Sequence, residues 1–127
     1  MSKIVQLKDN DGNVFPKSCE IYSTTEKRIG KWVDGKPIYR KSFSGTTVNN
    51  SNVVLGYISD IDNVINAYGW ATSNYSNTWG IPSGRTDNYN NNWRLSTNNN
   101  QLALVFGSYY TNNGKFTFTI EYTKTTD

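Results

Sequence analysis

The amino-acid sequence predicts an all-β fold, an antiparallel β-sandwich of jelly-roll-like type preceded by an extended N-terminal arm. Strict period-two alternation near the C-terminus is the clearest sign, and its apolar members are Phe116, Phe118, Ile120 and Tyr122. An Asp34-Gly35 pair between two alternating runs is typical of a β-hairpin turn. The 18 asparagines suit turns and the 14 threonines suit strands, whereas an aromatic content of 14% argues against disorder.

We expect two parts, an attachment arm at residues 1–22 and the β-sandwich domain at residues 23–127. In the arm, residues 2–7 alternate as a strand, residues 9–13 form a polar turn, and Pro16 keeps the preceding chain extended. The apolar side chains of the arm are Ile4, Val5, Leu7 and Phe15. A segment this short is too small to carry a core alone, and we expect it to attach to another protein.

The sandwich domain is predicted to consist of short strands joined by polar turns. Its first elements are a hairpin at residues 22–43, a polar loop at 44–52 and a strand at 53–58. Apolar residues within 58–68 follow helical spacing and Asp60 suits a helix N-cap, so we expect at most one helical turn near residues 60–63 before a strand. The later elements are a loop at 73–92, strands at 93–96 and 102–106 around a turn at 98–100, and a last strand at 116–123.

The low content of hydrophobic residues predicts an oligomer. One domain is expected for 127 residues, but only 35% of them are hydrophobic and the mean hydropathy is −0.67. Burial between subunits would offset the cost of ordering such a chain. The net charge of +3 is concentrated at residues 27–41, where basic residues alternate with apolar ones. We interpret these charges as outer strand faces and expect no nucleic-acid partner.

The side chains that usually carry catalysis are largely missing, so we expect a protein that is not an enzyme. The sequence contains no histidine, which removes the common catalytic triads and zinc sites. Cys19 is the only cysteine, which excludes an intrachain disulfide and a cysteine-rich metal site. Asp60 and Asp62 are close in sequence, but nothing indicates the desolvated carboxyl pair that glycan cleavage requires. We find no membrane-length apolar run and no signal peptide, and we expect no membrane insertion.

Residues 9–13 are similar to the start of a calcium loop, in which oxygen ligands alternate before a glycine. Asp, Asn and Gly also form plain turns without any ion. We therefore interpret this segment as a turn and expect no bound metal and no other cofactor.

A group of aromatic residues lies in or beside the Asn-rich loops, outside any clean alternation: Trp70, Tyr75, Trp79, Tyr89 and Trp93. Flat rings beside amides and hydroxyls suit a sugar, because ring faces stack and the polar groups bond its hydroxyls. Packing in the core or at a subunit interface also accounts for such rings. The sequence leaves both interpretations open, with these residues as candidate receptor or glycan contacts.

The segment at residues 22–41, YSTTEKRIGKWVDGKPIYRK, resembles a segment that recurs in structural proteins of phages and prophages of gut bacteria. Three further pieces match in order, at residues 3–16, 61–69 and 120–127. Together they span the chain from end to end, whereas residues 71–110 carry no matching motif. The resemblance implies a virion component with a β-sandwich body, of tail-fibre, head-fibre, receptor-binding or minor structural type.

The resemblance also implies how such a subunit works. The arm attaches it to other virion proteins, and the loops between Ala71 and Tyr110 face the host surface, where a glycan is one expected contact. Threefold association would add the apolar burial that a single chain lacks. Assembly in the host cytoplasm, as part of the virion, would explain the missing signal peptide. A stand-alone carbohydrate-binding module is the alternative function, and a glycan hydrolase is a more distant one.

Overall fold

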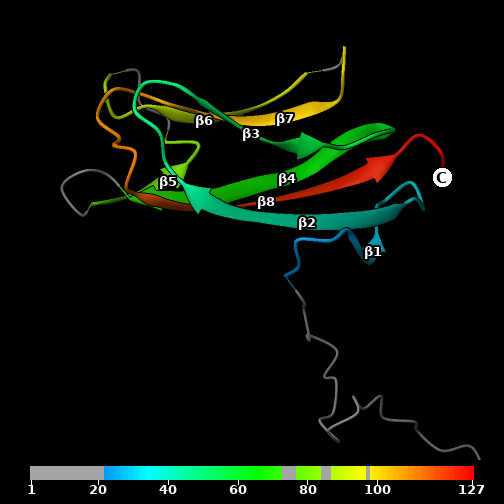
Figure 1. Ribbon diagram of the computed structural model, residues 1–127. Coiled ribbons are helices and arrows are strands. Elements are labelled where there is room, and N and C mark those ends of the chain that lie inside the picture. The colour runs from blue at the N-terminus through cyan, green and yellow to red at the C-terminus, as the bar shows by residue number, and fades with distance from the viewer. Residues whose placement is uncertain (1–21, 73–76, 84–86, 97) are drawn as a thin grey trace, which may run out of the picture.

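A computed structural model of the chain describes residues 22–72, 77–83, 87–96 and 98–127. Within these ranges the chain forms antiparallel strands and no helix. The strands are β1 (Lys27–Lys31), β2 (Pro37–Thr46), β3 (Asn52–Tyr57), β4 (Ile61–Thr72), β5 (Thr78–Ile81), β6 (Asn91–Leu95), β7 (Gln101–Phe106) and β8 (Lys115–Lys124). A three-stranded sheet, β3-β7-β6, lies over a five-stranded sheet, β1-β2-β8-β4-β5 (Figure 1). The predicted all-β antiparallel sandwich is confirmed.

The strand pairing is nested, as in a jelly roll. Strands early in the chain pair with strands late in the chain, β2 with β8 and β3 with β7. Between β2 and β4 the chain crosses to the second sheet for β3 and returns. The predicted arm, with Ile4, Val5, Leu7 and Phe15, lies outside the described residues except for Tyr22.

The core lies between the two sheets. Its fully buried members come mainly from β7 and β8 and include Leu102, Leu104, Phe106, Phe118, Ile120 and Tyr122. The predicted alternation along β8 is confirmed, because its apolar side chains all point to this inner face. The other face of β8 is also partly covered, since Thr119, Glu121 and Thr123 are buried. This happens because β8 is the central strand, with β2 on one side and β4 on the other.

The helical turn predicted near residues 60–63 is wrong. β4 begins at Ile61, directly after Asp60, whose φ of 63° lies in the left-handed region. The β4–β8 register shifts between Ile61 and Val64 and again between Val64 and Asn66. Each shift inserts an extra residue, so apolar side chains recur after three positions instead of two and imitate helical spacing.

Two predicted loops are shorter than expected. β2 extends to Thr46 and β3 begins at Asn52, so the loop between these two strands is reduced to residues 47–51. β5 interrupts the long loop predicted at residues 73–92. The Asp34-Gly35 turn is confirmed. There the Trp32 backbone N–H donates to the Lys36 carbonyl at 2.8 Å, and Gly35 has a φ of 89°.

Gly69 allows β4 and β8 to pair closely at the centre of the five-stranded sheet. A Cβ at this position would lie 2.1 Å from the Thr117 carbonyl oxygen and 2.8 Å from the Phe118 Cα. Because backbone atoms of a central strand cannot move aside easily, Gly69→Ala is expected to lower the free energy of unfolding by about 2–3 kcal/mol. Urea denaturation followed by tryptophan fluorescence measures this loss.

Gly80→Ala in β5 is the matched control, since a Cβ there would meet no atom within 4 Å. We expect its free energy of unfolding to stay within about 1 kcal/mol of the wild type. Equal stabilities of the two variants would contradict the packing described for Gly69.

Candidate ligand-binding face

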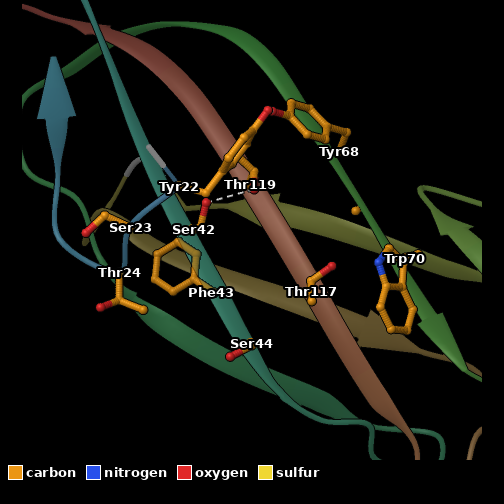
Figure 2. A pocket seen from close by; sticks show the side chains of 11 residues that line it. Tyr22, Ser23, Thr24, Ser42, Phe43, Ser44, Tyr68, Trp70, Thr117 and Thr119 are labelled. Carbon is orange, nitrogen blue, oxygen red and sulfur yellow. Dashed lines mark hydrogen bonds between the residues drawn. The ribbon is translucent and has the colours of Figure 1, made fainter. Parts of the chain in front are cut away.

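The outer face of the five-stranded sheet, turned away from the core, carries a hollow of about 540 Å³. It lies over β2, β8 and β4, beside the chain that leads into β1 (Figure 2). The lining residues share one property, which is that none carries a charge. They are Tyr22, Ser23, Thr24, Ser42, Phe43, Ser44, Tyr68, Gly69, Trp70, Thr117 and Thr119. We refer to this site as the outer hollow.

Two rows of side chains cross the floor of the outer hollow. Each row has a serine from β2, a threonine from β8 and an aromatic residue from β4, brought level by the strand register. The rows are Ser42–Thr119–Tyr68 and Ser44–Thr117–Trp70, and we call them the Tyr68 row and the Trp70 row. They form because alternate residues of a strand project from the same face.

The two rows differ in how far their polar groups are already engaged. In the Tyr68 row, the hydroxyls of Ser42 and Thr119 bond each other at 2.9 Å, and Thr119 is only 7% exposed. In the Trp70 row, the hydroxyls of Ser44 and Thr117 and the indole N–H of Trp70 have no hydrogen-bond partner among the described residues. Trp70 is 40% exposed, so its ring and these hydroxyls are accessible to a ligand.

A buried ion pair lies just beyond the Tyr68 row, at the next outward position of β2 and β8. The guanidinium of Arg40 donates to Glu121 Oε2 from both Nε, at 2.8 Å, and Nη2, at 2.7 Å. The Tyr22 ring lies over this guanidinium, with its centroid 4.5 Å from Arg40 Cζ. The Tyr68 hydroxyl is 3.4 Å from both the Tyr22 hydroxyl and Glu121 Oε2.

The surroundings of Tyr68 change the pKa of its phenol. Burial raises the pKa of its phenol well above the ordinary value, and the hydrogen bond with Tyr22 and the charge of Glu121 raise it further. The phenol therefore remains a neutral hydrogen-bonding group at any physiological pH. This holds the Tyr68 end of the outer hollow in one chemical state.

The outer hollow offers ring stacking and hydroxyl hydrogen bonds, but no charge and no catalytic pair. The lining contains no carboxylate. Asp62, considered in the sequence as half of a carboxylate pair with Asp60, instead accepts from Lys36 Nζ at 2.8 Å. Within the described residues, no group of three or more cysteine, aspartate or glutamate side chains is placed to hold a metal ion. Nor do those residues contain a helix long and apolar enough to cross a membrane.

The structure separates the aromatic residues that the sequence grouped together. Trp70 pairs with Gly80 across β4 and β5, whereas Trp79 pairs with Ala71, whose side chain is fully buried on the inner face. Trp70 therefore points outward to the outer hollow, and Trp79 points inward and packs against the core.

Tyr89 and Trp93 lie away from the outer hollow. Tyr89 packs on Trp79 with ring centroids 5.0 Å apart, and on Tyr109 at 3.7 Å. Trp93 is turned toward the core, where its ring lies 6.4 Å from that of Phe118. Tyr75 is outside the described residues. Trp79 and Tyr89 are thus brought together, and Trp70 is the one member of the set, within the described chain, that lines the outer hollow.

Sequence reasoning missed Tyr22, Tyr68 and the hydroxyl-bearing floor. A signal for the floor was present, because Thr117 and Thr119 alternate with the core residues of the last strand and so had to share the opposite face. The missing information was the register, which sets Ser44 and Trp70 on either side of Thr117. Cross-strand register is not visible in a single strand's own pattern.

Comparison with known proteins identifies no relative: no protein-family model, curated protein or solved structure matches the chain. The similarity of residues 22–41 to phage structural proteins therefore remains a prediction. The fold, the outer hollow and its uncharged lining are the observations that bear on function.

Proposed function

We propose that the chain is a structural, host-recognition subunit of a phage virion and that its outer hollow binds carbohydrate on the host surface. The main support for carbohydrate binding is the Trp70 row, in which an exposed indole ring lies beside two hydroxyls that make no hydrogen bond within the described residues. Apolar faces of a sugar stack on such a ring, while serine and threonine hydroxyls both donate to and accept from sugar hydroxyls. The virion part of the proposal is supported by the resemblance at residues 22–41.

A shallow, uncharged site on a rigid sheet suits recognition better than chemistry. The serines come from β2 and the threonines from β8, two neighbouring strands of one sheet, so these groups stay in place without a ligand. A carboxyl pair of the kind that cleaves glycosidic bonds is missing from the lining. We accordingly propose a binding protein that is not an enzyme, and release of sugar from host envelope material by the purified protein would contradict this.

The proposal includes association of three copies, attached by residues 1–22 to other virion proteins. It is supported by large apolar side chains on the outer face of the three-stranded sheet, where Val54 is 51% exposed and Tyr57 is 61% exposed. Covering them would add burial that a chain of 35% hydrophobic residues needs. Light scattering of the purified protein should give the mass of three chains, and a monomer would contradict this part.

A stand-alone carbohydrate-binding module would use the same outer hollow, so ligand binding does not distinguish it from a virion subunit. The location of the protein does. Electron microscopy of purified phage particles with a labelled antibody should place the chain on the particle. Finding it in the free fraction alone would favour the stand-alone module.

Trp70→Ala should weaken binding to immobilised host-surface glycans by about tenfold or more, since truncation of a central aromatic anchor typically has this effect. Trp32→Ala is the matched control, because Trp32 is 37% exposed, close to the 40% of Trp70, but lies at the β1–β2 turn. Biolayer interferometry measures binding, and circular dichroism verifies that both variants fold. Equal binding by both variants would remove the outer hollow as the glycan site.

A further inference from the structure

The outer hollow contains the same chemical pattern twice. The Tyr68 row and the Trp70 row each run serine, threonine, aromatic in the same direction across β2, β8 and β4. Tyr68 and Trp70 are two residues apart on one face of β4, which separates their positions by about 6.8 Å along an antiparallel strand. Two rows of the same residue types at this spacing, which differ in how far their hydroxyls are engaged, fit a ligand that itself repeats.

The two ends of this double site are different. At the Tyr68 end, Tyr22 lines the hollow and forms a wall, and its ring is supported by the Arg40–Glu121 pair on which it lies. Past the Trp70 row, the next outward positions along the strands are Thr46 of β2 and Lys115 of β8, which pair with each other and are both exposed. A chain-like ligand is therefore stopped at the Tyr22 end, whereas the Trp70 end is open to solvent.

The charges around the outer hollow select against an ionised ligand. No lysine or arginine belongs to the lining, and Arg40 already donates twice to Glu121. A carboxylate or sulfate placed here would lose water without gaining a cation, which is unfavourable. A neutral sugar keeps its hydrogen bonds by exchanging water for the hydroxyls of Ser44 and Thr117.

We infer that the outer hollow is specific for an uncharged oligosaccharide, two consecutive rings of which occupy the Tyr68 row and the Trp70 row, with one end against the Tyr22 wall. This inference rests on the proposed carbohydrate binding and adds the ligand's charge and minimum length. The Tyr68 unit stacks one ring beside the wall. The Trp70 unit stacks the next ring and supplies the unengaged hydroxyls.

Titration calorimetry of the full chain tests the inference with defined probes. The neutral probes are glucose, galactose and mannose with their di- and tetrasaccharides, and the acidic probes are di- and tetragalacturonic acid and sialyllactose. We expect affinity for the preferred neutral sugar to rise about tenfold or more from one ring to two, because the second ring gains its own stacking partner. Acidic probes of equal length should bind about tenfold more weakly or not at all.

Variants locate the two rings. Trp70→Ala should reduce the affinity for the disaccharide to that for the monosaccharide. Tyr68 also contacts Glu121, so Ser44→Ala and Thr117→Val provide a second test that leaves the wall unchanged. Each should weaken disaccharide binding about threefold to tenfold, the loss of one hydrogen bond.

The possible outcomes distinguish failure of the inference from failure of the proposed carbohydrate binding. Equal affinity for one ring and two rings, or stronger binding of the acidic probes, overturns the inference. If that binding still depends on Trp70, the proposed carbohydrate site stands. Binding of no saccharide at all overturns both. Two-ring binding that is unaffected by Ser44→Ala, Thr117→Val and Trp70→Ala shows that the sugar lies elsewhere and also overturns the inference.

Discussion

Replacing Glu121 by alanine is expected to lower the free energy of unfolding by about 3–5 kcal/mol, a large fraction of the stability of a domain of this size. The substitution leaves the Arg40 guanidinium without its carboxylate in a place where its side chain is only 5% exposed. Tyr22 lies over the guanidinium and shields that side of the ion pair. The cost arises because the buried guanidinium loses the carboxylate oxygen that both its Nε and its Nη2 bond.

Urea denaturation at neutral pH measures this effect, and two further variants determine its origin. Asp62→Ala breaks the Lys36 pair, whose side chains are 28% and 31% exposed, and should cost at most about 1 kcal/mol. The double variant Arg40→Met/Glu121→Leu removes both charges and should recover most of the stability. If Glu121→Ala proved as mild as Asp62→Ala, the pair would be solvated in solution and could not support the Tyr22 wall of the outer hollow.

The part of the fold that the sequence predicted is the part set by local patterns. Alternation along residues 116–122 identified the inner face of β8, and Asp34-Gly35 identified the β1–β2 turn. The sequence allowed one helical turn near residues 60–63 because bulges in β4 change the spacing of its apolar residues, and the structure has only the strand there. A bulge is an arrangement of two strands, so one strand's spacing does not reveal it.

The candidate site was predictable only in part, and the reason is sequence distance. Trp70 was one of five aromatic residues selected because they lie in or beside Asn-rich loops, outside any clean alternation. The partners that make it a site come from β2 and β8, and Arg40 lies 81 residues from Glu121. Such pairings follow from the nested strand order, which the local pattern of each strand leaves undetermined.

Two tyrosines buried in the core should make the protein sensitive to alkaline pH. Tyr110 and Tyr122 are 0% exposed, and burial raises the pKa of each phenol above its ordinary value of 10.0. For Tyr122 the hydrogen bond to Glu26 raises the pKa further, whereas the bond from Asn91 acts against the shift of Tyr110. Both phenols therefore stay protonated in the folded state at a pH where the unfolded chain ionises.

The stability from these groups is complete below pH 10 and is lost as the pH rises from there toward the raised pKa values. Above pH 10, each tyrosine held neutral in the folded state lowers the free energy of unfolding by about 1.4 kcal/mol per pH unit. Tyr110 and Tyr122 together contribute a slope of about 2.7 kcal/mol per pH unit, and Tyr68, whose pKa is also raised, adds to it. Urea denaturation at several pH values between about 9 and about 12, a range that begins just below the ordinary pKa of tyrosine, measures this slope.

Tyr122→Phe identifies the source of the slope. The variant should lose about 1 kcal/mol at neutral pH with the bond to Glu26, yet above pH 10 its slope should be smaller than that of the wild type by about 1.4 kcal/mol per pH unit. Tyr57→Phe, at a side chain 61% exposed, is the control and should retain the wild-type slope. An unchanged slope in Tyr122→Phe would mean that this phenol ionises in the folded protein. The interior of the sandwich would then be open to water at the position where the core closes between β8 and the chain leading into β1.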